Sequence, residues 1–143
     1  MMTDARTQER SITVGDLMAE EPIVVRADAP LSEAAHLMDE YDISGLPVIA
    51  EAGDLLGVIS ETDLVRARAT EWLWANWTGL HVRHLMSSPA LTIHASAPVA
   101  AAAIQMERDH VHRLVVVSDD DPLMPIGVIS TSDLVRAVAR SRR

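Results

Sequence analysis

The side chains best placed for chemistry are a serine and an aspartate that stand three residues apart and occur twice. Ser60 and Asp63 lie in the stretch GVISETDLVRA, and Ser130 and Asp133 lie in the stretch GVISTSDLVRA. Nine of the eleven positions are identical, and the stretches are 70 residues apart in a chain of 143 residues. We therefore expect two copies of one structural unit, each with the same polar pair.

Each pair has a structural interpretation that needs no ligand. The Val-Ile before each serine is typical of a strand end, and the Leu-Val-Arg-Ala after each aspartate is typical of a first helical turn. At such a junction the serine side chain caps the helix, and the acidic side chain favours its positive end. A duplicated helix would duplicate this cap, so repetition alone does not establish a binding role.

The sequence contains no arrangement typical of a catalytic or metal centre. The Ser-x-x-Asp pairs have no histidine base within their motif, and nucleophile elbows, phosphate-cradling glycine loops and His-Glu-x-x-His motifs do not occur. His81 with His84, and His110 with His112, have spacings that metal sites use, but neither pair has a cysteine or an obvious third ligand. We predict no catalytic residue and no metal site.

Composition predicts a globular chain and restricts the class of partner. Apolar residues make up 48% of the sequence, enough for a substantial core, and the net charge is -9. This charge argues against nucleic acid or anionic membrane as the main partner. There is no cysteine, and we find neither a signal peptide nor an apolar run long enough to cross a membrane. We therefore expect a cytoplasmic location.

The elements of the two copies follow the same order. A strand at 23–26, a helix beginning near Asp28-Ala-Pro30 and two strands at 46–49 and 55–59 precede the helix that Ser60 starts. Gly53 in the turn between the last two strands is available for a positive φ. The second copy repeats this order with a hairpin turn that is two residues longer. The predicted organisation is a disordered tail (1–10), a first repeat (11–69), a helical connection (70–80) and a second repeat (81–143).

All three tryptophans belong to the predicted connection, in the segment TEWLWANWTGL. Leu73, Trp77 and Leu80 share one helical face, with Trp74 nearby, which favours a core or dimer-interface stripe. Adenine stacking, a partner surface and membrane contact are the alternatives for the Trp72–Trp77 segment.

Several motifs, the two repeated stretches among them, identify a family resemblance. They are Asp-Leu-Met at 16–18, Leu-Met at 85–86, Ser-Gly-Leu-Pro-Val at 44–48, Val-His-Arg-Leu-Val-Val-Val at 111–117 and both Gly-Val-Ile-Ser-x-x-Asp-Leu stretches. With these, each half resembles a CBS domain, named after cystathionine β-synthase, over about residues 12–140. The resemblance implies an α+β fold of two βαββα repeats, each with a three-stranded sheet and a short N-terminal helix. It also implies that the repeats pack sheet to sheet about a pseudo-twofold axis.

The same resemblance implies a regulatory function. CBS pairs usually dimerise and bind AMP, ADP, ATP or S-adenosylmethionine between their sheets, where Asp63 and Asp133 would accept the ribose hydroxyls and Ser60 and Ser130 would lie beside the ribose or phosphate. We expect a non-catalytic module without a required cofactor, acting on an effector protein that the sequence does not identify. Its own exposed apolar helices predict a homodimer, with the helices after Ser60 and Ser130 in the interface.

The two copies differ where a phosphate would need positive charge. The second copy has His112-Arg113 where the first has Ser44-Gly45. An arginine offers a planar, permanently charged fork for phosphate oxygens, and in some CBS domains this position contacts phosphate. The alternative is an arginine in solvent or paired with Asp109 or Asp119. A dimerisation or interaction module without ligand is the alternative for the whole chain.

Overall fold

The computed structural model describes residues 12–20, 22–70 and 79–141, and the chain divides into two compact units. Residues 22–90 form one unit, which we call the Asp63 unit. Residues 91–143 together with 1–21 form the other, which we call the Asp133 unit. The predicted tail lies outside the described residues, as does most of the predicted Trp-rich connection.

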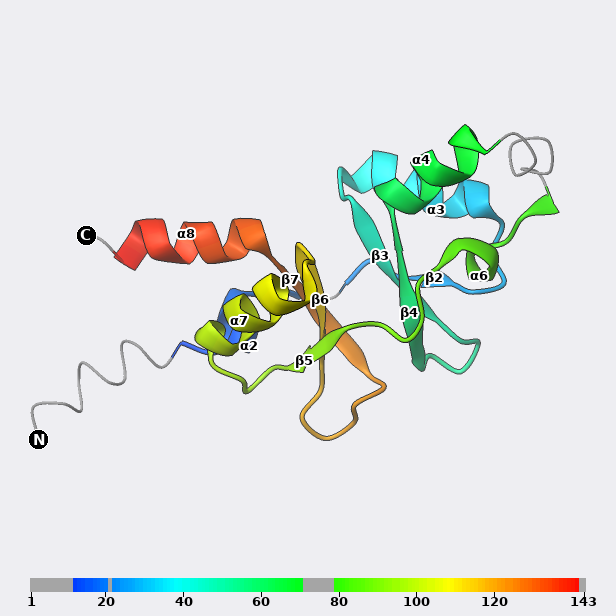
Figure 1. Cartoon of the computed structure of the whole chain (residues 1–143). Helices are drawn as coiled ribbons and strands as arrows, with labels where there is room; N and C mark the ends of the chain where they lie inside the picture. Colours follow the sequence, from blue (N-terminus) through cyan, green and yellow to red (C-terminus); the bar gives the residue numbers. More distant parts are fainter. Residues whose placement is uncertain (1–11, 21, 71–78, 142–143) are drawn as a thin grey trace, which may run out of the picture. The chain divides into compact units, whose positions relative to one another are not determined.

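The Asp63 unit contains a three-stranded sheet of order β2-β3-β4, with helices α3 and α4 packed beside each other (Figure 1). Strand β2 runs parallel to β3, and β3 runs antiparallel to β4. Its elements are β2 (Val25–Arg26), α3 (Leu31–Tyr41), β3 (Gly45–Ile49), β4 (Leu55–Ser60), α4 (Glu61–Ala69) and α6 (Val82–Leu85). The predicted order is confirmed, although β2 is shorter than the expected strand at 23–26.

Helix α3 covers the core of this unit with one apolar face. Leu31, Ala34 and Met38 recur at helical spacing and are buried. The helix ends at Asp42, which has a left-handed backbone with φ 52, a conformation that a short polar side chain tolerates. Its buried face belongs to an apolar cluster that includes Leu46, Val48, Ile59, Leu80 and Val82.

The Asp133 unit repeats this arrangement, but its sheet has four strands. Its elements are α2 (Val14–Leu17), β1 (Ala19–Glu20), β5 (Thr92–His94), α7 (Val99–Asp109), β6 (Arg113–Val117), β7 (Pro125–Ser130) and α8 (Thr131–Ser141). The α+β class and the two βαββα repeats are therefore confirmed. The expected three-stranded sheet is wrong for this unit, because β1 pairs antiparallel with β7 to give the order β1-β7-β6-β5.

The short helix at the beginning of each repeat packs in the compact unit that contains the rest of the other repeat. Helix α2 docks on the Asp133 unit, where the Val14 amide donates to the Ala97 carbonyl at 2.8 Å. Helix α6 docks on the Asp63 unit, where the Val82 amide donates to the Ala29 carbonyl at 2.9 Å. Val14 and Val82 are both fully buried. The compact units therefore exchange these segments relative to the sequence repeats.

The repeated glycine of each Gly-Val-Ile-Ser motif makes room for the segment after these short helices. A Cβ atom on Gly127 would lie 2.7 Å from the Ala19 carbonyl oxygen, and one on Gly57 would collide with the Ser87 carbonyl oxygen. Such contacts are too close for any side chain, because these backbones pair directly. The glycines thus have a structural reason to recur that is independent of any ligand.

The two hairpins differ in the way the sequence predicts. In the Asp63 unit, Gly53 takes a positive φ of 103 in the turn between β3 and β4, which confirms the prediction for this glycine. In the Asp133 unit, the Ser118 amide donates to the Met124 carbonyl at 3.0 Å across a longer turn. Both strand pairs nevertheless end at the serine of the Ser-x-x-Asp motif, directly before the following helix.

Candidate functional site

Each Ser-x-x-Asp pair forms a complete hydrogen-bonded box at the start of a helix. In the Asp133 unit, the Ser130 amide donates to Asp133 Oδ2 at 2.8 Å and the Ser130 hydroxyl donates to the same oxygen at 3.0 Å. The Asp133 amide in turn donates to Ser130 Oγ at 3.3 Å. Ser60 and Asp63 make the same three bonds at the same distances. The capping interpretation is confirmed for both pairs, and the ligand role stays a prediction.

A third box in the same chain shows that the pattern serves helix capping by itself. The Thr13 amide donates to Asp16 Oδ2 at 2.9 Å, and the Asp16 amide donates to Thr13 Oγ1 at 3.3 Å. The hydrogen bond from the Thr13 amide, together with its side chain, lowers the pKa of Asp16. The box alone is therefore weak evidence for a ligand, and the argument depends on what surrounds it.

The capping bonds leave the second carboxylate oxygen of each aspartate for other partners. The Asp63 and Asp133 side chains are only 11% and 14% exposed. Asp133 Oδ1 accepts a hydrogen bond from Arg136 Nη1 at 3.0 Å, whereas Arg66 Nη1 lies 3.6 Å from Asp63 Oδ1. Both arginines are more than half exposed, so these surface pairs are weak. Oδ1 is therefore the oxygen of each carboxylate that takes no part in the cap.

The strand register brings the basic pair of the second copy beside the box. Arg113 lies directly opposite Ser130 in the β6–β7 ladder. The Thr131 amide, one residue after Ser130, donates to the carbonyl of His112, one residue before Arg113, at 2.9 Å. This bond means that the backbones of Arg113 and Ser130 do not hydrogen-bond to each other. Side chains in such pairs share one face of the sheet and lie close together. Two segments that are distant in sequence therefore meet at one end of the strand pair.

The equivalent place in the Asp63 unit has the same backbone without the charge. Gly45 lies opposite Ser60, and the Glu61 amide donates to the Ser44 carbonyl at 2.9 Å. A glycine cannot supply a phosphate ligand from its side chain. The two boxes therefore have the same capping hydrogen bonds. They differ in the residue of the neighbouring strand, which is Gly45 in one unit and Arg113 in the other.

Asp109 and Asp119 each contact a residue of α7 or of the loop before it. Asp109 Oδ1 receives the Arg108 guanidinium at 3.2 Å. Asp119 Oδ1 accepts from the amide and the hydroxyl of Ser96 at 3.2 and 3.0 Å. These contacts tie Asp109 to its own helix and Asp119 to the loop before α7.

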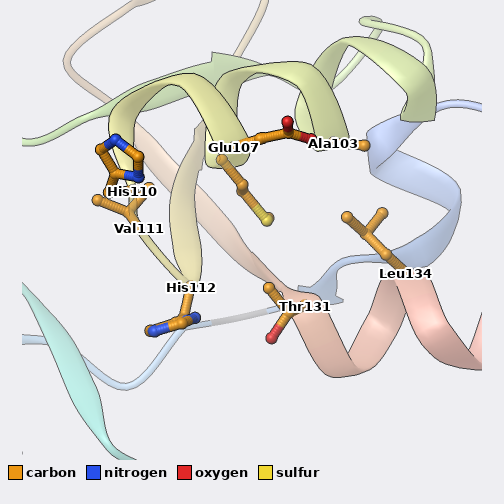
Figure 2. A pocket seen from close by; sticks show the side chains of 8 residues that line it. Ala103, Glu107, His110, Val111, His112, Thr131 and Leu134 are labelled. Atoms are coloured by element: carbon orange, nitrogen blue, oxygen red, sulfur yellow. The ribbon is translucent and has the colours of Figure 1, made fainter.

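A cavity of about 470 Å³ adjoins the box within the Asp133 unit. In Figure 2, His112 and Thr131 lie at the starts of β6 and α8, while Glu107 and His110 approach from the end of α7. The apolar part of the lining comprises Ala103, Met106, Val111 and Leu134. Of the six predicted site residues, His112 lines this cavity, whereas the Ser130–Asp133 box lies next to it through Thr131.

Sequence reasoning assigned no role to Thr131, although the repeat contains a signal for it. Thr131 stands at one of the two positions where the repeated stretches differ, and the first copy has Glu61 there. At the edge of the cavity, Thr131 therefore has a neutral hydroxyl where the first copy has a carboxylate. Comparing the two copies position by position would therefore have indicated a less acidic site in the second copy.

The histidine pair near α6 binds backbone groups. His84 Nδ1 accepts the His81 amide at 2.9 Å, and His81 Nδ1 lies 3.0 Å from the Asp28 carbonyl oxygen. Among residues 12–20, 22–70 and 79–141, no three His, Asp or Glu side chains are grouped so that they could hold a metal ion. None of the helices in this described part is both long and apolar enough to span a bilayer.

Comparison with known proteins gives the family. The CBS-domain model matches residues 14–70 and 82–140, which together make up most of the chain. The chain belongs to the CBS-domain family. The CBS pair CBSX2 in complex with AMP is 30% identical, with a TM-score of 0.78 over 92% of this chain and 98% of that one. The CBS pair of protein MJ0100, in complex with 5′-methylthioadenosine and S-adenosyl-L-methionine, is 25% identical, with a TM-score of 0.79 over 90% of this chain and 97% of that one.

Curated relatives of this CBS pair include longer proteins with their own activities. Homoserine O-acetyltransferase from Methanococcoides burtonii is 31% identical over 88% of this chain. L-aspartate semialdehyde sulfurtransferase from Methanocaldococcus jannaschii is 27% identical over 86% of this chain. The match spans only 24% and 22% of those proteins, respectively. Their names therefore describe proteins about four times the length of the shared region.

Proposed function

We propose that this CBS pair is a non-catalytic regulatory module that binds an adenosine-containing ligand, either an adenine nucleotide (AMP, ADP or ATP) or S-adenosylmethionine. The observation that carries the proposal is the meeting of His112-Arg113 with the Ser130–Asp133 box at one end of the β6–β7 pair. Complexes of similar CBS pairs with AMP and with S-adenosyl-L-methionine support the ligand class.

Each group at this place has a role that suits one part of a nucleotide. Asp133 Oδ1 accepts the 2′ and 3′ hydroxyls of the ribose, since Oδ2 already holds both Ser130 donors. Ser130 lies beside the ribose or the first phosphate. A carboxylate at the ribose repels phosphate, so Arg113 and His112 supply the compensating donors and charge. The Ser60–Asp63 box, which has Gly45 opposite, suits a less charged adenosine compound.

Calorimetric titration with AMP, ATP and S-adenosylmethionine tests this proposal. The proposal predicts saturable binding of at least one of these compounds, without turnover of ATP. A ligand that binds only the folded state should also raise the melting temperature, with about 2.7 kcal/mol of stabilisation at 100 times its dissociation constant. If no adenosine compound binds or stabilises the chain at millimolar concentration, the proposal is wrong.

The second candidate function is a dimerisation or protein-interaction module without a ligand. The observation that favours it is the completeness of both Ser-Asp boxes as helix caps. In either case we propose a homodimer that uses α4 and α8, because Val65 and Val135 on these helices are each 67% exposed. Light scattering that gives the mass of a monomer at micromolar concentration would contradict the dimer.

A further inference from the structure

Glu107 is the one acidic side chain among the described residues that line the cavity beside the Ser130–Asp133 box. Figure 2 shows it on α7, with Thr131 at the start of α8. The other polar residues of this lining are His110, His112 and Thr131, and neither lysine nor arginine belongs to it. Once an ordinary imidazole has lost its proton, the charge that a ligand meets inside the cavity is therefore negative.

No described residue of the chain uses the Glu107 carboxylate. The neighbouring Arg108 is engaged with Asp109, whose two carboxylate oxygens accept its Nε and Nη2 at 3.2 and 3.3 Å. Within the described ranges, the exposed side chain of Glu107 makes neither a hydrogen bond nor an ion pair. Glu107 also lies in the last turn of α7, where the helix dipole disfavours an acidic group. Its charge is therefore left for a ligand, and the fold does not depend on it.

The cavity lies where the phosphate chain of a nucleotide would continue. Arg113 and Ser130 face each other in the β6–β7 ladder. The residue before Arg113 is His112 and the residue after Ser130 is Thr131, and both line the cavity. A first phosphate held beside Arg113 and Ser130 would thus stand at the edge of the cavity. Each further phosphate would bring negative charge into the space that Glu107 lines.

We infer that Glu107 is a specificity-determining residue that makes this site selective for a nucleotide with one phosphate. The selectivity rests on the proposed adenosine-ligand function and narrows the ligand to AMP in preference to ADP and ATP. Like charges repel more strongly in a partly enclosed site than in bulk water, because the effective dielectric constant is lower. Discrimination of this kind comes from an unfavourable contact with the competing ligand.

Calorimetric titration of AMP, ADP and ATP into wild type and Glu107→Gln tests this role. The buffer has pH 8, where an ordinary imidazole is neutral, and EDTA, which removes divalent cations that would bridge carboxylate and phosphate. Wild type should bind AMP more tightly than ADP, and ADP more tightly than ATP. Glu107→Gln should raise ATP affinity by about 5- to 10-fold and AMP affinity by less than about twofold, because only ATP loses a close repulsion.

Three further variants separate the local charge from other effects. Asp39→Asn is the matched control, since Asp39 is the equivalent exposed residue on α3 and its replacement removes the same net charge. It should leave the preference for AMP over ATP as in wild type. Glu107→Asp keeps the charge and should keep the preference, whereas Glu107→Lys should bind ATP more tightly than AMP. All four variants should melt close to wild type, because the substituted side chains are exposed.

Every result of these titrations decides for or against the selectivity. Equal gains for AMP and ATP in Glu107→Gln, or an equal effect of Asp39→Asn, would overturn the role of Glu107 and leave the ligand proposal intact. A wild type that prefers ATP, or that binds S-adenosylmethionine but no nucleotide, would do the same. If no adenosine compound binds wild type, both the ligand proposal and the selectivity are wrong.

Discussion

The Ser60–Asp63 and Ser130–Asp133 boxes have the same three hydrogen bonds, yet their surroundings differ. The ladder residue opposite Ser130 is Arg113, and the one opposite Ser60 is Gly45. The outer oxygen of Asp133 accepts an arginine hydrogen bond, whereas the arginine near Asp63 is 3.6 Å away. The helix cap is thus the same in both units. Only the Asp133 unit has a basic side chain opposite the serine of the cap.

A residue can recur in both copies because the fold needs it or because a ligand needs it. The glycine, serine and aspartate of the motif all have structural work within their own unit, so their recurrence follows from the repeated fold. A ligand site needs additional groups, and these groups are where the two copies diverge. The Asp133 unit is therefore the better candidate for a charged nucleotide.

The largest expected effect concerns the charge beside the box. Arg113→Ala should weaken AMP binding by about 1.5–3 kcal/mol, because a charge-assisted contact to phosphate is lost. Adenosine, which has no phosphate, should lose little affinity. Titration of wild type and variant with both compounds measures the difference. Equal losses for AMP and adenosine would assign Arg113 a structural role.

The next effect tests what the two units share. Gly127→Ala should lower the free energy of unfolding by about 1–3 kcal/mol, because the added Cβ forces β1 away from β7. Gly57→Ala should cost a similar amount through the Ser87 carbonyl. Gly79→Ala is the matched control, since its Cβ would meet no heavy atom within 4 Å. Denaturant unfolding that finds Gly127→Ala no worse than Gly79→Ala would contradict the close approach.

The smallest effect concerns the arginines that follow the boxes. Arg136→Gln removes the hydrogen bond to Asp133 Oδ1 and should raise AMP affinity by at most about 1 kcal/mol, because the exposed pair is weak. Arg66→Gln should leave AMP affinity unchanged, since Arg66 lies 3.6 Å from Asp63 and 72% of its side chain is exposed. A large loss of affinity in Arg136→Gln would mean that this arginine contacts the ligand itself.

Sequence patterns predicted the features that depend on local periodicity and turn chemistry. The helix start expected near Asp28-Ala-Pro30 matches α3, which begins at Leu31, and Gly53 took the positive φ expected of its turn. The Ser-x-x-Asp spacing predicted both helix starts. These features depend on neighbouring residues, so the sequence contains the information directly.

Long-range pairing was harder to predict. The residues next to Val14 and Val82 in the sequence do not indicate which unit buries these side chains. The exchange of α2 and α6 between the units was therefore not predicted. The fourth strand of the Asp133 sheet was not predicted either, because β1 has only two residues and pairs with β7, which is distant in the sequence. The hydrogen bond of Arg136 to Asp133 depends on side-chain conformation. The repeated sequence does not predict this conformation, because the equivalent residues Arg66 and Asp63 are farther apart.

The central claim is that Asp133 binds the ribose of an adenosine ligand in addition to capping α8. Asp133→Asn keeps the size of the side chain and an oxygen for the Ser130 donors, but it removes the anionic acceptor. The cap should lose only about 0.3–1 kcal/mol, mainly its favourable interaction with the helix dipole. A hydroxyl bond to a charged acceptor is worth about 1.5–3 kcal/mol, so AMP affinity should fall by about 10- to 100-fold.

The decisive measurement is calorimetric titration of AMP into wild type, Asp133→Asn and Asp63→Asn, with the melting temperature of each determined alongside. We predict that Asp133→Asn loses AMP affinity while its melting temperature changes little, and that Asp63→Asn affects AMP much less. A 2′,3′-dideoxy ligand should bind wild type weakly and lose little more in Asp133→Asn. If Asp133→Asn instead lowers the melting temperature and leaves AMP affinity unchanged, the repeated Ser-Asp pair is a helix cap without a ligand.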